Sequence, residues 1–333
     1  YAARGTQYNT YSDGVYVGES PLGPFTLAAN NPYSYKPGGF LPGAGHGSTM
    51  QDEQGNWWHT ATMRISINHH FERRVGLWPA GFDADGELYC NQRYGDWPMT
   101  LSGYRQDAWR EPHWMLLSVG KEASASSAVE GKGPEKAVEE NVQTWWQAVS
   151  TGRDEWLQVD LGKVYDVHAV QVNFADDAID IPCPGEIRPG SQARYIEERD
   201  LATQWKLLGS QDGETWFVIE DKSAAVTDLP HDLVVREEGL AIRYLRLTDM
   251  AVPYGQKPCI SGLRIFGLGD GEAPAVPAFT AVRANDLDMN IEITPQGDTL
   301  GYNMIFGTSE EKLYHSVMVF ASGEHRIGAL IAG

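Results

Sequence analysis

Alternation of apolar and polar side chains in residues 156–161 is the feature that most constrains how this chain can fold. Leu157, Val159 and Leu161 alternate with more polar neighbours, and this period of two is typical of a strand with one covered face. Gly162 follows and is expected to end the strand. Similar short segments recur at 169–174, 203–210, 215–220, 242–250 and 263–268. Because no helical pattern lies between them, we predict an all-β sandwich.

Five motifs in this stretch carry a family resemblance. They are SASSAV (124–129), KAVEENVQTWWQA (136–148), EWLQVDLG (155–162), SQDGETW (210–216) and RYLRL (243–247). In this order they resemble the coagulation factor V/VIII C-type, or discoidin, module over about residues 117–269. The resemblance implies a discoidin-like β-sandwich jelly roll, which in bacterial enzymes usually serves as a carbohydrate-binding module. The Asp212-Gly213 pair of the fourth motif independently predicts a hairpin turn.

Charge and composition restrict the partners. A formal charge of −19 and a pI of about 4.8 argue against binding polyanions such as nucleic acid. Eleven Trp and fifteen Tyr can fill cores, the ordinary role of any single one, or stack on sugars. No apolar run is long enough for a membrane span. The chain opens on Tyr1 without a charged or apolar leader, so we expect it to begin downstream of an export signal in a secreted, periplasmic or cell-surface protein.

Residues 1–116 contain repeated hairpin patterns, with turns at 52–55 and 83–86, and repeated hairpins suggest propeller blades. Three motifs, SPLGPF (20–25), GAGHGSTMQDEQGNWWH (43–59) and ERRVGLWPAGFDADGELYCNQRYGDWP (72–98), resemble the last part of the five-bladed β-propeller of glycoside hydrolase family 43. The resemblance implies that His46 faces the propeller axis and helps to hold a central metal ion, often calcium. A structural histidine packed beneath Trp57 is the alternative.

Catalytic carboxylates are the part of the family pattern that we do not find. Inverting glycosidases need a general acid and a general base, spaced to admit a water molecule. In family 43 these groups come from the first three blades, which this chain lacks. The remaining carboxylates include Asp13, Asp52, Asp83, Asp85, Asp96, Glu72 and Glu111. Three of them lie in turn motifs, where an aspartate caps its own backbone, so we assign no catalytic residue and expect this chain alone to be inactive.

A calcium site is implied within the discoidin resemblance. Members of that family often hold structural calcium in the loop that matches residues 136–144, and Glu139, Asn141 and Thr144 are the candidate oxygen donors here. A Glu commonly precedes the last strand and completes the site, whereas Ser261-Gly262 stand there in this chain. A plain hydrogen-bonded turn is therefore the alternative.

A long insertion at residues 175–202 is unusual for a compact sandwich, and such loops tend to be functional or disordered. Sugar recognition needs an aromatic platform and groups that hydrogen-bond hydroxyls, so Arg194, Tyr195 and Tyr254 are the candidate substrate-binding residues. The chain has three cysteines, Cys90, Cys183 and Cys259. A Cys183–Cys259 disulfide and three free thiols are both consistent with the sequence.

Residues 270–333 begin with a Pro/Gly/Ala-rich linker and continue with four strand-like segments at 279–285, 289–295, 301–309 and 312–320. They resemble an incomplete fibronectin type III domain. The domains are thus predicted at 1–116, 117–269 and 270–333. The predicted function is part of a secreted glycosidase that hydrolyses terminal arabinofuranosides, xylosides or galactosides of plant polysaccharides with inversion. A non-catalytic glycan-binding protein and an adhesion module are the alternatives.

Overall fold

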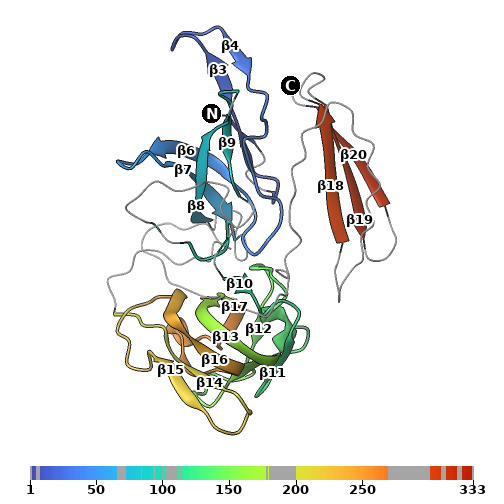
Figure 1. Cartoon of the computed structure of the whole chain (residues 1–333). Helices are drawn as coiled ribbons and strands as arrows, with labels where there is room; N and C mark the ends of the chain where they lie inside the picture. Colours follow the sequence, from blue (N-terminus) through green and yellow to red (C-terminus); the bar gives the residue numbers. More distant parts are fainter. Residues whose placement is uncertain are drawn as a thin grey trace. The chain divides into compact units, whose positions relative to one another are not determined.

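The structure is a computed structural model of the chain, and its described residues form β-strands (Figure 1) and two short 3-10 turns. It describes residues 8–65, 73–83, 85–92, 95–99, 101, 112, 114–177, 179 and 200–268, and the backbone of the strands at 2–4, 301–308, 313–320 and 325–331. Contacts divide the chain into two compact units, Tyr1–Pro277 and Ala278–Gly333. In the described ranges, no helix has the length and apolar character needed to cross a membrane.

Three small antiparallel sheets, which we call the N-terminal sheets, open the first unit. They are β1 (Ala2–Arg4), β2 (Ser12–Gly14) and β5 (Ser34–Tyr35); β3 (Tyr16–Gly18) and β4 (Phe25–Leu27); and β6 (Gly45–Gln51), β7 (Trp57–Arg64), β8 (Arg73–Phe82) and β9 (Leu88–Cys90). The last sheet is a meander in the order β6-β7-β8-β9. A parallel bridge from Ser12 to Ala44 links it to β2.

Aspartates close two turns of this meander. The Asp52 carboxylate accepts hydrogen bonds from the backbone N–H groups of Gln54 and Asn56 at 3.0 and 2.8 Å. The Asp83 carboxylate accepts two bonds from its own turn in the same way, at 3.0 and 2.9 Å. Both predicted hairpins are confirmed. A four-stranded meander is the content of one propeller blade, whereas the propeller itself stays a prediction.

Eight strands and two 3-10 turns form the discoidin-like sandwich. They are β10 (Met115–Leu116), β11 (Glu122–Ala125), η1 (Pro134–Ala137), β12 (Trp146–Gln147), β13 (Leu157–Phe174), β14 (Gln204–Ser210), β15 (Phe217–Asp221), β16 (His231–Ala251), η2 (Pro253–Gly255) and β17 (Cys259–Leu268). The antiparallel order is β10-β17-β13-β16-β14-β15, with β11 on β13 and β12 on β17. The first half of β13 pairs with β11 and the second half with β17.

The alternating segment lies at the start of β13 as predicted. Leu157 and Val159 are fully buried in the main core. The predicted end of the strand at Gly162 is wrong, because β13 continues past it with a shift of register against β16. Gly162 has φ of 87° and donates to the Asp160 carboxylate at 2.7 Å. A left-handed residue at this point bends the strand without ending it.

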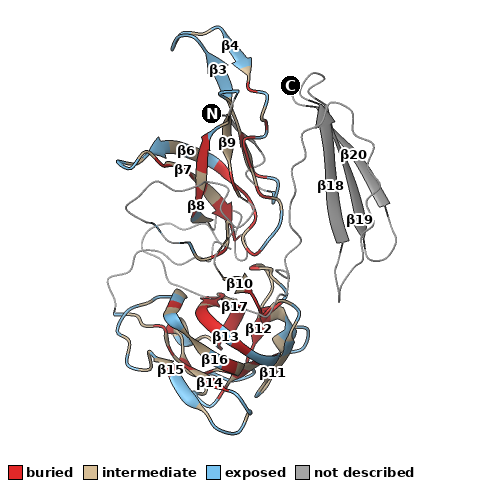
Figure 2. Ribbon diagram, in the orientation of Figure 1, coloured by how far each residue is buried: buried red, intermediate tan, exposed pale blue. Residues whose placement is uncertain are grey.

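Buried residues lie on β13 and β17 of the sandwich and also on β7 and β8 (Figure 2). Trp146 and Trp205 are at most 1% exposed, which confirms core packing as the role of these two tryptophans. The Trp146 indole N–H also donates to the Ser127 carbonyl at 2.8 Å, so its one polar atom is satisfied. The loops at the strand ends are therefore anchored to strands that are packed around a buried core.

The second unit is a three-stranded antiparallel sheet of β18 (Gly301–Thr308), β19 (Leu313–Phe320) and β20 (His325–Ile331). The strands predicted at 301–309 and 312–320 are confirmed, whereas those at 279–285 and 289–295 lie outside the described residues. β20 was not predicted. The fibronectin type III resemblance and the three domain boundaries stay predictions.

Candidate functional site

Loops of the sandwich meet at one end, which we call the loop tip. In the described part of the chain they are residues 126–145, 175–177, 200–203, 222–230 and 252–258. The Ala148 N–H donates to the Pro258 carbonyl at 3.0 Å, and the Phe174 N–H donates to the Pro230 carbonyl at 2.8 Å. These backbone bonds bring together loops that are far apart in the sequence.

Lys132 is the centre of a polar cluster at the loop tip. Its ammonium donates to Gln147 Oε1 at 2.9 Å and to Asp177 Oδ2 at 2.5 Å. The same nitrogen lies 4.9 Å from the centroid of the Trp145 ring. The Lys132 and Asp177 side chains are 30% and 21% exposed, so the cluster is half-buried and open to a ligand.

The strands fix the members of this cluster. Gln147 lies in β12 and pairs with Cys259 of β17. Asp177 follows the end of β13, and its N–H donates to Gln256 Oε1 at 3.4 Å. The Gln256 amide also donates to Asp176 Oδ1 at 3.4 Å. One acceptor from β12 and one from the loop after β13 are therefore placed beside one ammonium and one indole.

Tyr254 is the predicted sugar-binding residue that the structure describes. It lies in η2 at the loop tip with φ of 62°. A left-handed conformation is costly for a residue with a side chain, and such strain clusters at functional sites. Arg194 and Tyr195 lie outside the described residues, so their predicted role is untested.

Chemically, the loop tip suits a polyhydroxylated ligand. Carboxylate and amide oxygens accept hydrogen bonds from hydroxyl groups, and an ammonium donates to them. An indole offers an apolar face to the C–H groups of a sugar ring. Among the described residues, no group of three or more His, Cys, Asp and Glu could hold a metal ion.

Side chains of the predicted calcium loop do come together. The Thr144 hydroxyl donates to Glu139 Oε1 and, at 3.1 Å, to the Asn141 carbonyl. Lys136 donates to Glu139 Oε2 at 3.0 Å, and Asn141 Oδ1 accepts from the Gln143 N–H at 3.0 Å. These bonds engage side-chain oxygens that calcium would need. The side chains thus form the hydrogen bonds expected of a plain turn, which was the alternative to a calcium site. Calcium binding stays a prediction.

The described cysteines are free thiols. Cys259 is buried at the loop tip, and burial raises the pKa of its thiol to about 12. Burial also raises the pKa of Cys90. Cys183 lies outside the described residues, so the Cys183–Cys259 disulfide stays a prediction. A thiol with a raised pKa is a poor nucleophile at neutral pH.

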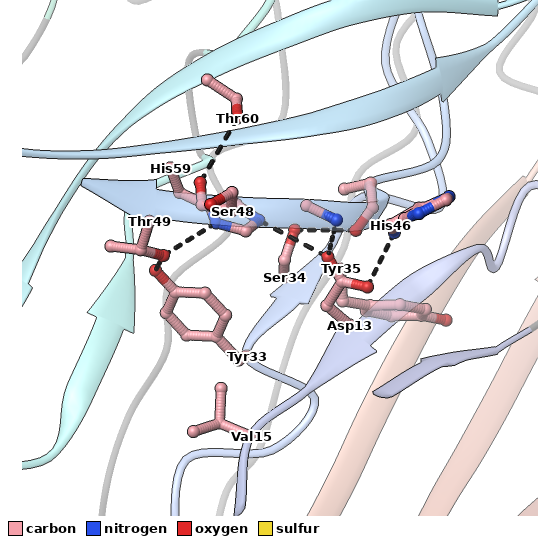
Figure 3. Close-up of polar contacts among 12 residues, drawn as sticks. Asp13, Val15, Tyr33, Ser34, Tyr35, His46, Ser48, Thr49, His59 and Thr60 are labelled. Carbon is pink, nitrogen blue, oxygen red and sulfur yellow. Dashed lines mark hydrogen bonds and ion pairs between the residues drawn. The ribbon is translucent and has the colours of Figure 1, made fainter. Parts of the chain in front are cut away.

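A second polar cluster lies inside the N-terminal sheets and is centred on Asp13 (Figure 3). The Asp13 side chain is fully buried, and its carboxylate accepts the backbone N–H groups of His46 and Gly47 at 2.7 and 2.6 Å. His46 has φ of 58° where the β6–β7 register shifts, which aims both N–H groups at one acceptor. Burial raises the pKa of Asp13, and the two backbone bonds oppose the shift.

His59 is the fully buried neighbour of Asp13. Its Nε2 lies 3.7 Å from Asp13 Oδ2, and its Nδ1 is 3.0 Å from the hydroxyl of Thr49, which in turn contacts the Tyr33 hydroxyl at 2.9 Å. Burial lowers the pKa of His59 to about 4, so the ring is neutral at neutral pH. The cluster holds strands together and offers no exposed acid–base pair.

His46 was the predicted metal ligand of this region. Its side chain is exposed on β6, and Trp57 packs edge-on against Phe82, with ring centroids 5.2 Å apart. The alternative, a structural histidine beneath Trp57, is therefore wrong. The axial metal role of His46 stays a prediction.

Some residues of both clusters were missed from the sequence. Lys132 and Gln147 carry no motif of their own, and only the position of Gln147 directly after the tryptophan pair could have pointed to the loop tip. The sequence marks Asp13 only as one of the carboxylates of residues 1–116. Its place in a short strand between tyrosine-rich segments gave no sign that it binds the backbone of residues 46 and 47.

Comparison with known proteins supports the central part of these interpretations. Residues 136–247 match the family model of the F5/F8 type C group described as the NedA-like, galactose-binding domain. The predicted discoidin module is thereby confirmed in this range, whereas the resemblances to glycoside hydrolase family 43 and to fibronectin type III stay predictions. No curated protein matches the chain.

Several solved structures are similar to it. Chitosan-binding module 1 of a chitosanase/glucanase from Paenibacillus sp. IK-5 is 17% identical, over 46% of this chain and 98% of that one, with a TM-score of 0.35. The family 32 carbohydrate-binding module of NanJ from C. perfringens, in complex with galactose, is 14% identical over 46% and 98%, with a TM-score of 0.35. A structure described as a glycoside hydrolase is 18% identical over 79% and 55%, with a TM-score of 0.40.

Proposed function

We propose that the sandwich is a carbohydrate-binding module and that it binds its sugar at the loop tip. The observation that carries the proposal is the Lys132–Gln147–Asp177 cluster beside Trp145, in a domain that matches a galactose-binding family. A galactose-type ring presents hydroxyl groups on its edges and C–H groups on one face. The cluster offers hydrogen-bond partners for the hydroxyl groups, and the indole offers an apolar surface for the C–H groups.

Binding to the full chain tests this proposal. Lys132→Met keeps an unbranched apolar stem over Trp145 but removes the ammonium, and we expect it to weaken galactoside binding about tenfold, the effect of losing one charged hydrogen-bond donor. Lys163→Met is the matched control, because that lysine also lies over an aromatic ring, Tyr165, at 5.0 Å, but in β13 outside the loop tip. Equal loss in both variants, or no binding on a glycan array, would refute the site.

We also propose that the N-terminal sheets belong to the propeller of a family 43-like glycosidase that acts on terminal arabinofuranosides, xylosides or galactosides. The four-stranded meander β6–β9 and its aspartate-closed turns support this. Asp13 is fully buried and Asp52 accepts four bonds from its own hairpin, so neither is suited to act as a general acid or base. We therefore expect this chain alone to be inactive. Turnover of aryl glycosides by it would contradict the statement that it lacks a catalytic acid and base.

A non-catalytic glycan-binding or adhesion protein is the competing function. It shares the proposed loop-tip site but predicts no hydrolysis of any glycoside. A pull-down of protein partners that persists in excess monosaccharide would favour adhesion, whereas release by the monosaccharide would favour glycan binding.

A further inference from the structure

Arg264 of β17 is a cation buried in the sandwich. Its side chain is 1% exposed and binds the Glu140 carboxylate with two bonds of 2.8 and 2.9 Å. It also donates to Gln171 Oε1 at 2.7 Å. Moving a guanidinium out of water costs free energy unless its N–H donors are hydrogen-bonded. Here the two bonds to one carboxylate offset that cost.

The remaining partners of Arg264 come from the N-terminal part of the chain. Its Nη1 donates to the Asp96 carbonyl, and its guanidinium carbon lies 4.7 Å from the centroid of the Phe40 ring. Asp96 is held in turn by Lys36 in a buried ion pair of 2.5 Å. The Arg264 side chain thus makes contacts on both sides of a junction inside the first unit.

The 139–144 loop completes this junction. The Val142 N–H donates to the Phe40 carbonyl at 3.1 Å, and the Gln143 amide donates to the Ile65 carbonyl at 2.7 Å. Phe40, Ile65 and Val142 form a separate buried apolar cluster. The loop that the discoidin resemblance would assign to calcium therefore faces another part of the same chain.

Gly262 of β17 leaves room for the Phe40 ring. A Cβ atom on Gly262 would lie 2.7 Å from the Phe40 ring, a distance that requires the ring or the strand to move. Phe40 is fully buried, so the ring has no open space to move into. A side chain at position 262 and Phe40 in its present place therefore exclude each other.

We infer that the 139–144 loop and β17 form a docking surface for the residues that follow β5, β7 and β9, with the Arg264–Glu140 ion pair at its centre. Phe40 fills the space next to Gly262, and Glu140 pairs with the guanidinium. The joint holds the module against the rest of the first unit without a metal ion.

Calcium dependence tests the first half of this inference. We expect the melting temperature of the full chain to be the same in excess EDTA and in millimolar CaCl2, and terbium to give no sensitised luminescence through Trp145 or Trp146. A specific site filled far above its Kd would raise the melting temperature by several degrees. Such a rise, abolished by Glu139→Gln, would overturn the proposal.

A mutant cycle tests the docking. Gly262→Ala is expected to lower the melting temperature by several degrees in the natural chain, and less in a Phe40→Ala background, where the clash is absent. Equal effects in both backgrounds would show that Phe40 does not dock at Gly262 in solution.

A second variant tests whether the Arg264 ion pair contributes more to stability than an ion pair within the sandwich. Arg264→Met should lower the melting temperature by about 5–10 °C, because it leaves Glu140 half-buried without its partner. Arg243→Met is the matched control, since Arg243 also binds a carboxylate, Asp160, with two bonds of 2.8 Å, but within the sandwich and more exposed. An equal or smaller effect for Arg264→Met would refute its role at the joint.

Discussion

The Asp13 carboxylate is shielded from water, and its charge is met by two backbone N–H groups of the β6 bulge. An amide in its place has one acceptor oxygen, and its NH2 group would face one of these donors. We expect Asp13→Asn to destabilise the chain by about 1–3 kcal/mol, the cost of leaving a buried donor unsatisfied. Denaturant unfolding measures this. Glu53→Gln is the control, because it removes the charge of an exposed carboxylate in the turn after β6. An equally small loss of stability in both variants would contradict the role of Asp13.

His59 contributes stability that depends on pH. Because burial lowers its folded pKa from 6.5 to about 4, the unfolded chain binds more protons than the folded chain between these values. The contribution is complete above pH 6.5 and is lost as the pH falls to about 4, by up to about 3 kcal/mol. We expect His59→Gln to be less stable at pH 7 and to have a flatter stability profile from pH 6.5 to 4. A profile parallel to that of the natural chain would contradict this.

At the scale of single elements, the β14–β15 hairpin depends on one carboxylate. Asp212 Oδ1 accepts the N–H groups of Thr215 and Glu214 at 2.7 and 2.8 Å, and the Ser210 hydroxyl at 3.0 Å. These bonds lower the pKa of Asp212 to about 2. A depressed acid pKa gives stability that is present above the ordinary value of 3.8 and is lost as the pH falls through about 2.

The prediction for this hairpin is a pH-dependent difference between two proteins. Asp212→Asn should melt below the natural chain at pH 5 and above, and the gap should close as the pH approaches 2, since protonated Asp212 resembles the amide. Thermal melts over this range measure the gap. Glu214→Gln is the control, because it removes one charge from the same turn and leaves the bonds to Asp212 in place. A difference in melting temperature that stays constant down to pH 2 would contradict the prediction.

Single elements are predictable from the sequence where local chemistry fixes them. Asp212-Gly213 predicts its hairpin because the turn at 211–216 is fixed by local chemistry, in which the Asp212 carboxylate accepts the N–H groups of Glu214 and Thr215. The continuation of β13 past Gly162 was missed because a register shift hides the period of two. The Arg264–Glu140 pair joins residues 124 positions apart, and no local pattern announces such a contact. The same holds for Lys132 and Asp177, which only the folding of β13 brings together at the loop tip.

At the scale of the whole molecule, the net charge of −19 acts on any charged ligand that approaches the loop tip. The tip itself carries both signs, in Glu130, Glu135, Glu139, Glu140, Asp176, Asp177, Asp200 and Asp228 and in Lys132, Lys136, Lys222 and Lys257. Neutral sugars are indifferent to this field, whereas uronic acid polymers are repelled by it. The proposed function therefore predicts a preference for neutral glycans that salt should reduce.

Salt dependence tests this preference directly. Added NaCl shortens the screening length from about 30 Å at 0.01 M to about 8 Å at 0.15 M. We expect binding of a neutral galactan to the full chain to stay constant over this range, and binding of polygalacturonate to be weaker at low salt and to strengthen as salt is added. Isothermal titration at the two ionic strengths measures both. Tighter polygalacturonate binding at low salt would mean that Lys132 and its neighbouring lysines outweigh the overall charge, and the ligand class would then be acidic.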